Sequence, residues 1–161
     1  HCIPIDPFYL SWKAKEYNTE AKFIELAGEV NRKMTENITH RIARALNDYK
    51  KSVKDSKIMI VGVAYKKDID DMRESPALRI MELLEYKGAN VCYHDPYVKT
   101  VKLLKNTELT KENIEKQDAI VITTDHTNVD YDLMAKHAKL IVDTRNRMAT
   151  VKNPKATIIR A

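Results

Sequence analysis

Basic side chains follow two apolar runs of this sequence, a pattern typical of phosphate binding. Tyr65, Lys66 and Lys67 come directly after one run, and Arg145 comes after another. An ammonium group and a guanidinium fork both bind phosphate oxygens, and an aromatic ring can flank a planar ligand. Lys66 and Arg145 therefore indicate a site for a nucleotide or a sugar phosphate. The alternative is a pair of solvated surface cations.

Cys2 is the second candidate for chemistry. It lies in a short proline-bounded segment, with Asp6 four residues further on. A thiolate is a strong nucleophile, and a nearby carboxylate can orient the water that hydrolyses a covalent intermediate. A lone cysteine without a visible base is more often structural. The residues alone leave both interpretations of Cys2 open.

A parallel sheet is the element expected to position the basic side chains. The apolar run from Ile58 to Val63 has the length of a strand buried on both faces. A polar loop follows, and Ser75 and Pro76 then predict a helix start, with the serine oxygen capping free N–H groups. Gly88 suits a left-handed C-cap before a second strand over residues 90–94. This is a βαβ unit, in which ligands bind at the carboxyl ends of the strands.

Later segments extend the same sheet. The further elements predicted are strands over 118–123, 139–143 and 156–159, and helices from about 111 and over 129–138. Strands that alternate with helices indicate a Rossmann-like, doubly wound parallel α/β sheet. Its strands would deliver four loops to one edge, at 65–66, 95, 123–126 and 143–145. There we expect Asp143 to orient its loop and His126 to be a hydrogen-bonded loop residue, not a base.

The first 52 residues differ from the rest. Residues 1–18 contain two prolines and four aromatic side chains, which predict an extended segment and a turn. From Glu20 to about Tyr49, apolar residues recur at steps of three and four, which predicts one helix about 45 Å long. That length favours a connector or dimerisation helix over a surface helix lying along the core. A short polar linker over 51–56 is expected between this helix and the α/β part of the chain.

Several classes of ligand are not expected. The predicted βαβ turn has only Gly62, whereas dinucleotide-binding turns use three glycines to approach a pyrophosphate, so NAD binding there is not expected. The formal net charge of +5 is spread over 161 residues without a basic run, so no nucleic acid is expected. No pair of histidines or cysteines has metal-ligand spacing, so no metal site is expected.

Other features concern the origin and location of the chain. No apolar run approaches the roughly 20 residues that span a bilayer, so no membrane segment is expected. Two cysteines without a signal pattern predict a cytoplasmic protein. The chain begins with His-Cys and no initiator Met, so we expect a fragment of a longer protein.

Three motifs together resemble one known family. The segments HCIPIDPFYL, GVAYKKDIDDMRESPAL and VDTRN occur in the order and spacing of the UDP-glucose/GDP-mannose dehydrogenase family. They are most similar to the branch that oxidises UDP-N-acetylhexosamines, in particular UDP-N-acetylglucosamine. The resemblance implies that residues 1–52 end a central domain with a dimerisation helix, and that residues 53–161 form the UDP-sugar-binding domain. It also implies that the family's NAD-binding domain lies outside this chain, which would be inactive alone.

The resemblance further implies a reaction and a role for each candidate residue. The family oxidises the sugar C6 alcohol to a carboxylate with two NAD, through a thiohemiacetal and a thioester, which supplies surface polysaccharide precursors. Cys2 would be the nucleophile, and Asp6 would help to position water. The binding residues would be Tyr65 (usually Phe in the family), Lys66 and Arg145 for the UDP-sugar, and Arg73 for NAD.

Two further hypotheses remain. The chain could be a stand-alone nucleotide-binding or regulatory module in which Cys2 is incidental. It could also be an interaction protein built around the long helix, which would dimerise without nucleotide affinity. Selective reactivity of Cys2 would favour an enzyme over the nucleotide-binding module. UDP binding would exclude the interaction protein.

Overall fold

A five-stranded parallel sheet forms the centre of the structure. The computed structural model describes residues 2–161, and its strands lie in the order β2-β1-β5-β6-β7, with every neighbouring pair parallel. The strands are β1 (Lys57–Val61), β2 (Asn90–His94), β5 (Ala119–Ile122), β6 (Leu140–Asp143) and β7 (Thr157–Arg160). The Rossmann-like, doubly wound fold predicted from the sequence is confirmed.

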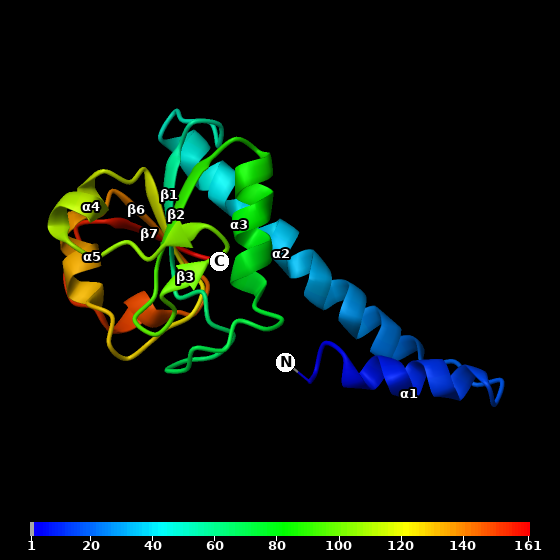
Figure 1. The fold of residues 1–161 in the computed structure, drawn as a ribbon. Helices are drawn as coiled ribbons and strands as arrows, with labels where there is room; N and C mark the ends of the chain where they lie inside the picture. The colour runs from blue at the N-terminus through cyan, green and yellow to red at the C-terminus, as the bar shows by residue number, and fades with distance from the viewer. Residues whose placement is uncertain (1) are drawn as a thin grey trace.

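Helices cover both faces of the sheet (Figure 1). They are α3 (Pro76–Tyr86) with the end of α2 (Lys22–Asp48) on one face, and α4 (Lys111–Glu115) with α5 (Tyr131–His137) on the other. Ile58 and Ile60 of β1 pack under α2 and α3, whereas Met59 and Val61 pack under α4 and α5. This alternation buries β1 on both faces, as its continuous apolar sequence predicts.

Three short elements were not predicted. A hairpin forms from β3 (Thr100–Val101) and β4 (Leu104–Lys105), and a 3-10 helix, η1 (Arg147–Thr150), follows β6. Each is only two to four residues long, which gives too little periodicity for a prediction.

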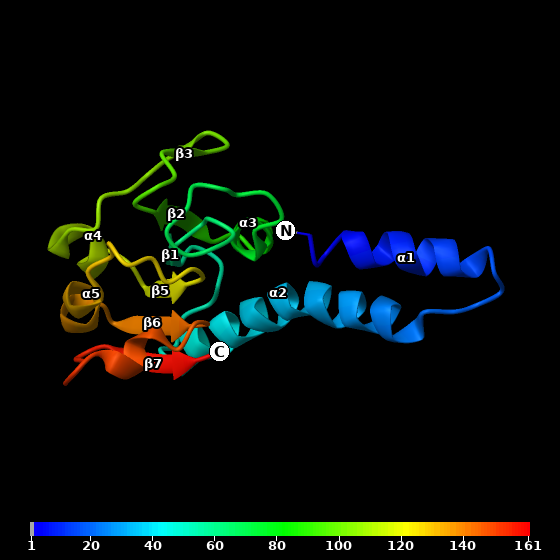
Figure 2. The same cartoon turned by 90° about the horizontal axis from the view of Figure 1, so that it is seen from below.

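The two N-terminal helices form an arm that projects from the sheet (Figures 1 and 2). The buried residues of α2 begin only at Ile38, so its first half extends beyond the α/β body alongside α1 (Asp6–Lys15). The long helix was predicted, but the extended conformation expected before it is wrong. Pro7 stands in the first turn of α1, where its missing N–H breaks no helical bond. Within residues 2–161, no helix is long and apolar enough to cross a membrane.

Helix α3 begins and ends at the predicted residues. Pro76 is its first residue, and Gly88 follows it with a left-handed φ of 84°. The predicted capping hydrogen bond is wrong, because the Ser75 hydroxyl is buried and has no partner among the described residues. The amide of Leu78 donates to the backbone oxygen of Ser75 instead, at 3.2 Å.

Candidate functional site

Loops that are distant in sequence meet at the carboxyl ends of the parallel strands. The Thr123 hydroxyl donates to the backbone oxygen of Gly62, and the Thr144 hydroxyl donates to that of Ile122 at 2.8 Å. The Gly62 amide donates to His94 O at 2.9 Å, which joins the end of β2 to the same edge. The predicted convergence of four loops is confirmed. A ligand at this edge would therefore contact several loops at once.

The loop after β1 presents the first basic group of this edge. Lys66 and Lys67 are exposed, whereas Tyr65 is half-buried, and the Tyr65 amide donates to Asp71 O at 2.7 Å across the loop. Among residues 2–161, no ion pair is found for Lys66. Its ammonium group can therefore bind an anionic ligand without first breaking a salt bridge.

Arg145 lies on the loop after β6 and is partly oriented by acidic residues. Its Nε is 3.3 Å from Asp125 Oδ1, and its backbone amide donates to Asp143 Oδ1 at 2.9 Å. Asp143 also accepts the Met148 amide at 2.7 Å, so this buried carboxylate orients its loop as predicted. The Asp125 contact was not predicted, because the sequence does not show how the two loops face each other.

A groove of about 680 Å³ connects this edge to the arm. Thr123, Thr144 and Arg145 form one side of it, and the start of α3 and the middle of α2 form the other. Pro4, which closely follows Cys2 in sequence, also lines this groove. Tyr65 and Lys66 are not among its lining residues. The structure therefore joins Arg145 with the cysteine segment in one groove and leaves Lys66 on the adjacent loop.

Cys2 and Asp6 lie one helical turn apart. The Asp6 amide donates to Cys2 O at 2.8 Å, and the Cys2 side chain is exposed. Asp6 thus begins α1 four residues after Cys2, and the roles of both residues stay a prediction.

Arg73 lies on the loop that leads into α3 and is paired with Asp71. Its Nε and Nη2 donate to the Asp71 carboxylate at 3.0 and 2.7 Å, and these hydrogen bonds lower the pKa of Asp71 to about 2. Asp71 is the main cause that raises the pKa of Arg73, and a negative charge on Cys2 raises it further. Both views draw the described residues before α1 near the loop that leads into α3 (Figures 1 and 2).

Sequence reasoning did not identify the network beneath the Lys66 loop. The buried Asp95 and His126 are hydrogen-bonded to each other, and both contact the backbone of this loop. One signal was available: an Asp-Pro pair after a strand is typical of a turn in which the carboxylate accepts backbone amides. Asp95 does accept the amides of Tyr97 and Val98, at 2.9 and 3.1 Å.

Comparison with known proteins relates this chain to one protein family. Residues 59–150 match the family model of the UDP-glucose/GDP-mannose dehydrogenase family, UDP binding domain. A UDP-N-acetyl-D-mannosamine dehydrogenase of Methanococcus vannielii is 31% identical over 154 residues, which are 91% of this chain and 34% of that protein. A UDP-glucose 6-dehydrogenase of Rhizobium meliloti is 28% identical over 155 residues, 90% of this chain and 35% of that protein.

A solved structure is similar over nearly the whole chain. The structure of UDP-D-ManNAc dehydrogenase from Pyrococcus horikoshii superposes with a TM-score of 0.81 at 30% identity, over 99% of this chain and 38% of that one. The chain thus spans about a third of the length of the curated relatives it matches. By sequence and by fold, this chain belongs to the UDP-glucose/GDP-mannose dehydrogenase family.

Proposed function

We propose that this chain is the UDP-sugar-binding part of an NAD-dependent dehydrogenase that oxidises the C6 alcohol of a UDP-N-acetylhexosamine to a carboxylate. The observation that carries the proposal is the match of residues 59–150 to the UDP binding domain, together with basic side chains on its ligand edge. In this proposal, residues 53–161 form the UDP-sugar-binding domain, and residues 1–52 end a central domain.

The substrate is held by three side chains of the strand edge. Lys66 and Arg145 bind the diphosphate, because an ammonium group and a guanidinium fork neutralise and orient phosphate oxygens. The half-buried Tyr65 places its ring beside the nucleotide sugar. Asp125 keeps the Arg145 guanidinium on the strand edge until a ligand replaces that contact.

Cys2 provides covalent catalysis in this proposal. After C6 is oxidised to an aldehyde, the thiolate adds to its carbonyl carbon, and the oxygen takes a proton to give a thiohemiacetal. Removal of a second hydride and of the hydroxyl proton gives a thioester. Asp6 positions a water that hydrolyses it, which releases the carboxylate and returns the thiol. Covalent capture prevents the aldehyde from escaping between the two oxidations.

When bound, NAD accepts the hydrides, and this chain provides only a minor part of the NAD-binding site. The turn after β1 has one glycine, whereas the usual dinucleotide turn needs three. Arg73 could make a single contact with NAD, because its Nε and Nη2 are bound to Asp71 and only Nη1 remains for a phosphate oxygen. We therefore propose that NAD binds mainly outside this chain and that the chain alone does not catalyse the oxidation.

The identity of the sugar is inferred from the relatives and not from the geometry of the site. The sequence motifs predicted UDP-N-acetylglucosamine, whereas relatives from Methanococcus vannielii and Pyrococcus horikoshii are UDP-N-acetyl-D-mannosamine dehydrogenases. The two sugars differ only in configuration at C2. We propose a UDP-N-acetylhexosamine as the substrate class, with the N-acetylmannosamine form as the one favoured by these relatives.

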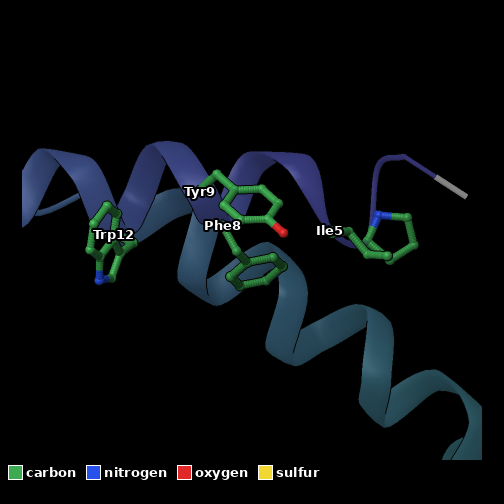
Figure 3. A pocket seen from close by; sticks show the side chains of 5 residues that line it. Ile5, Phe8, Tyr9 and Trp12 are labelled. Atoms are coloured by element: carbon green, nitrogen blue, oxygen red, sulfur yellow. The ribbon is translucent and has the colours of Figure 1, made fainter.

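A second copy of this chain is the proposed partner of the arm. The apolar stripe of α2 is buried at Ile38 and Ile42, but the side chains of Phe23 and Val30 are 88% and 52% exposed. Helix α1 adds an apolar hollow, in which Tyr9 and Trp12 are exposed while Phe8 points towards α2 (Figure 3). Pairing with the same arm of a second chain would bury this stripe, and the resulting homodimer needs no other protein.

Calorimetric titration of the chain with UDP, UDP-N-acetylmannosamine, UDP-N-acetylglucosamine and NAD tests the proposal. We expect binding of UDP and of one UDP-sugar, and weaker or no binding of NAD. Lys66→Ala should weaken UDP binding at least about tenfold, because it removes a charged phosphate contact. Lys67→Ala is the matched control, since it removes the same charge from the next exposed residue and should change the affinity less than about twofold.

The outcomes separate the hypotheses. NAD binding tighter than UDP binding would overturn the proposal and indicate a cofactor domain. Equal losses of UDP affinity in the two lysine variants would show that UDP binding depends only on the overall charge of the loop.

A further inference from the structure

The loop that carries Tyr65 and Lys66 is anchored on both sides by one buried pair of side chains. Asp95 follows β2 and His126 follows β5, and both are fully buried. His126 Nε2 lies 3.0 Å from Asp95 Oδ2. Neither residue belongs to the loop, yet each accepts a hydrogen bond from its backbone.

Asp95 holds the loop before Tyr65. Its Oδ2 accepts the amides of Val63 and Ala64, at 2.7 and 3.1 Å. Burial would raise the pKa of Asp95, but hydrogen bonds from His126, Tyr97 and Val63 outweigh it and hold the pKa at about 2. The carboxylate is therefore ionised at neutral pH, and charge-assisted bonds to backbone amides are the stronger kind.

His126 holds the loop after Lys67. Its Nδ1 accepts the Asp68 amide at 2.9 Å, so the ring proton lies on Nε2 and is donated to Asp95. Asp68 has a left-handed φ of 60°, and its carboxylate accepts the amide and hydroxyl of Thr127 at 2.7 and 2.6 Å. The chain therefore turns at a defined point, and only residues 65–67 lie between the two anchors.

We propose that Asp95 and His126 are positioning residues for nucleotide binding: together they fix the loop that presents Tyr65 and Lys66 to the UDP-sugar. This inference rests on the proposed function of Lys66. A lysine on a loose loop must lose conformational freedom when it binds a phosphate, which weakens binding. A loop with only three residues between its two anchors has already lost most of that freedom. The pair thus acts on the ligand through the backbone and does not touch it.

Two substitutions of His126 divide its two hydrogen bonds. Asn places its amide oxygen near the position of Nδ1, so His126→Asn can still accept the Asp68 amide but no longer reaches Asp95. Gln places its amide nitrogen near the position of Nε2, so His126→Gln still donates to Asp95 but releases Asp68. Both variants put a neutral amide into the same buried site, and each serves as the control for the other.

UDP affinity, measured by calorimetry beside the unfolding midpoint of each variant, is the test. We expect His126→Gln to weaken UDP binding at least about fivefold and His126→Asn less than about twofold, whatever the order of their stabilities. Equal affinities in folded variants would overturn the inference and leave the pair a purely structural role. Absence of UDP binding by the parent chain would overturn the proposed function as well.

Amide hydrogen exchange in the unchanged chain keeps the inference testable if a variant does not fold. The amides of Val63, Ala64 and Asp68 should exchange at least about tenfold more slowly than those of Lys66 and Lys67. Fast exchange at Asp68 would show that the loop is not anchored there, and would overturn the inference.

Discussion

The ring of Phe8 in α1 occupies the space that a side chain at Gly28 in α2 would need, since a Cβ at position 28 would lie 2.0 Å from Phe8 Cζ. Ala at position 28 favours the helix by about 1 kcal/mol but displaces the Phe8 ring, which costs about 1–3 kcal/mol. We expect Gly28→Ala to lower the free energy of unfolding of the arm. Trp12, the single tryptophan, reports on this arm by its fluorescence in urea.

The same substitution in a Phe8→Ala background is the control. There the overlap is gone, so Gly28→Ala should raise the urea midpoint through helix propensity alone. A stabilising effect in both backgrounds would show that Phe8 does not pack on Gly28 in solution.

Gly62 and Gly88 have nearly the same left-handed φ, 82° and 84°, but different surroundings. A Cβ at Gly62 would lie 2.2 Å from Thr124 O, whereas at Gly88 the nearest atom is Lys54 Cγ at 3.1 Å. Gly62→Ala should therefore cost about 2–5 kcal/mol, the sum of conformational strain and a forced backbone shift. Gly88→Ala carries only the strain, about 1–2 kcal/mol. Chemical denaturation of both variants checks the difference, and equal costs would contradict the close approach of β1 and β5.

Asp95 makes the folded state sensitive to acid. Its pKa falls from an ordinary value of 3.8 to about 2 in the folded chain, so its ionised form stabilises the native state at neutral pH. This shift contributes about 2 kcal/mol, which is fully present above about pH 5 and is lost as the pH falls from about 4 to 2. Urea unfolding at several pH values should show the difference between the parent and Asp95→Asn shrinking over that interval.

Asp71 is a useful contrast for this measurement. Its pKa is also lowered to about 2, but by a hydrogen bond from an exposed Arg73. Solvent screens such exposed pairs, so Asp71→Asn should change the pH dependence less than Asp95→Asn does. An equal effect of the two substitutions would show that the burial of Asp95 does not matter.

The two cysteines should differ in reactivity. Cys2 is exposed, whereas Cys92 in β2 is partly buried, and burial raises the pKa of the Cys92 thiol. Iodoacetamide at pH 8 should therefore modify Cys2 at least about tenfold faster than Cys92. Peptide mapping by mass spectrometry measures both rates, and Cys2→Ser should leave only the slow reaction. Faster labelling of Cys92 would contradict this arrangement.

The sequence predicts those elements in which local pattern and tertiary structure agree. The strands β1, β5 and β6 are short apolar runs, and burial on both faces of a parallel sheet requires such runs. Helix α1 fails as a prediction because two prolines suggest an extended chain, although proline is compatible with the first turn of a helix. The serine cap of α3 fails because the buried Ser75 hydroxyl does not form the expected bond, although Ser75 stands at the N-cap position.

The same distinction between local pattern and tertiary packing applies to the candidate site. Parallel topology places Lys66 and Arg145 at one edge, because the carboxyl ends of all its strands point the same way. The contacts of Asp125 with Arg145 and of His126 with Asp68 depend instead on how closely two loops approach. For His126 and Asp68, the two loops follow β5 and β1, and their approach depends on Gly62 lying against Thr124, a packing detail that no local pattern encodes.

The exposed half of the α2 stripe provides the test of the proposed homodimer. Val30 is 52% exposed and lies in the middle of this half. A glutamate there would be an unpaired charge in the buried interface, so Val30→Glu should raise the dissociation constant of the dimer at least about 100-fold. Leu103→Glu is the matched control, because Leu103 is 97% exposed on the β3–β4 hairpin and outside the arm. Sedimentation at several concentrations should show a dimer for the parent and for Leu103→Glu, and a monomer for Val30→Glu. A parent chain that stays monomeric at all concentrations would contradict the homodimer and leave the stripe for a partner outside this chain.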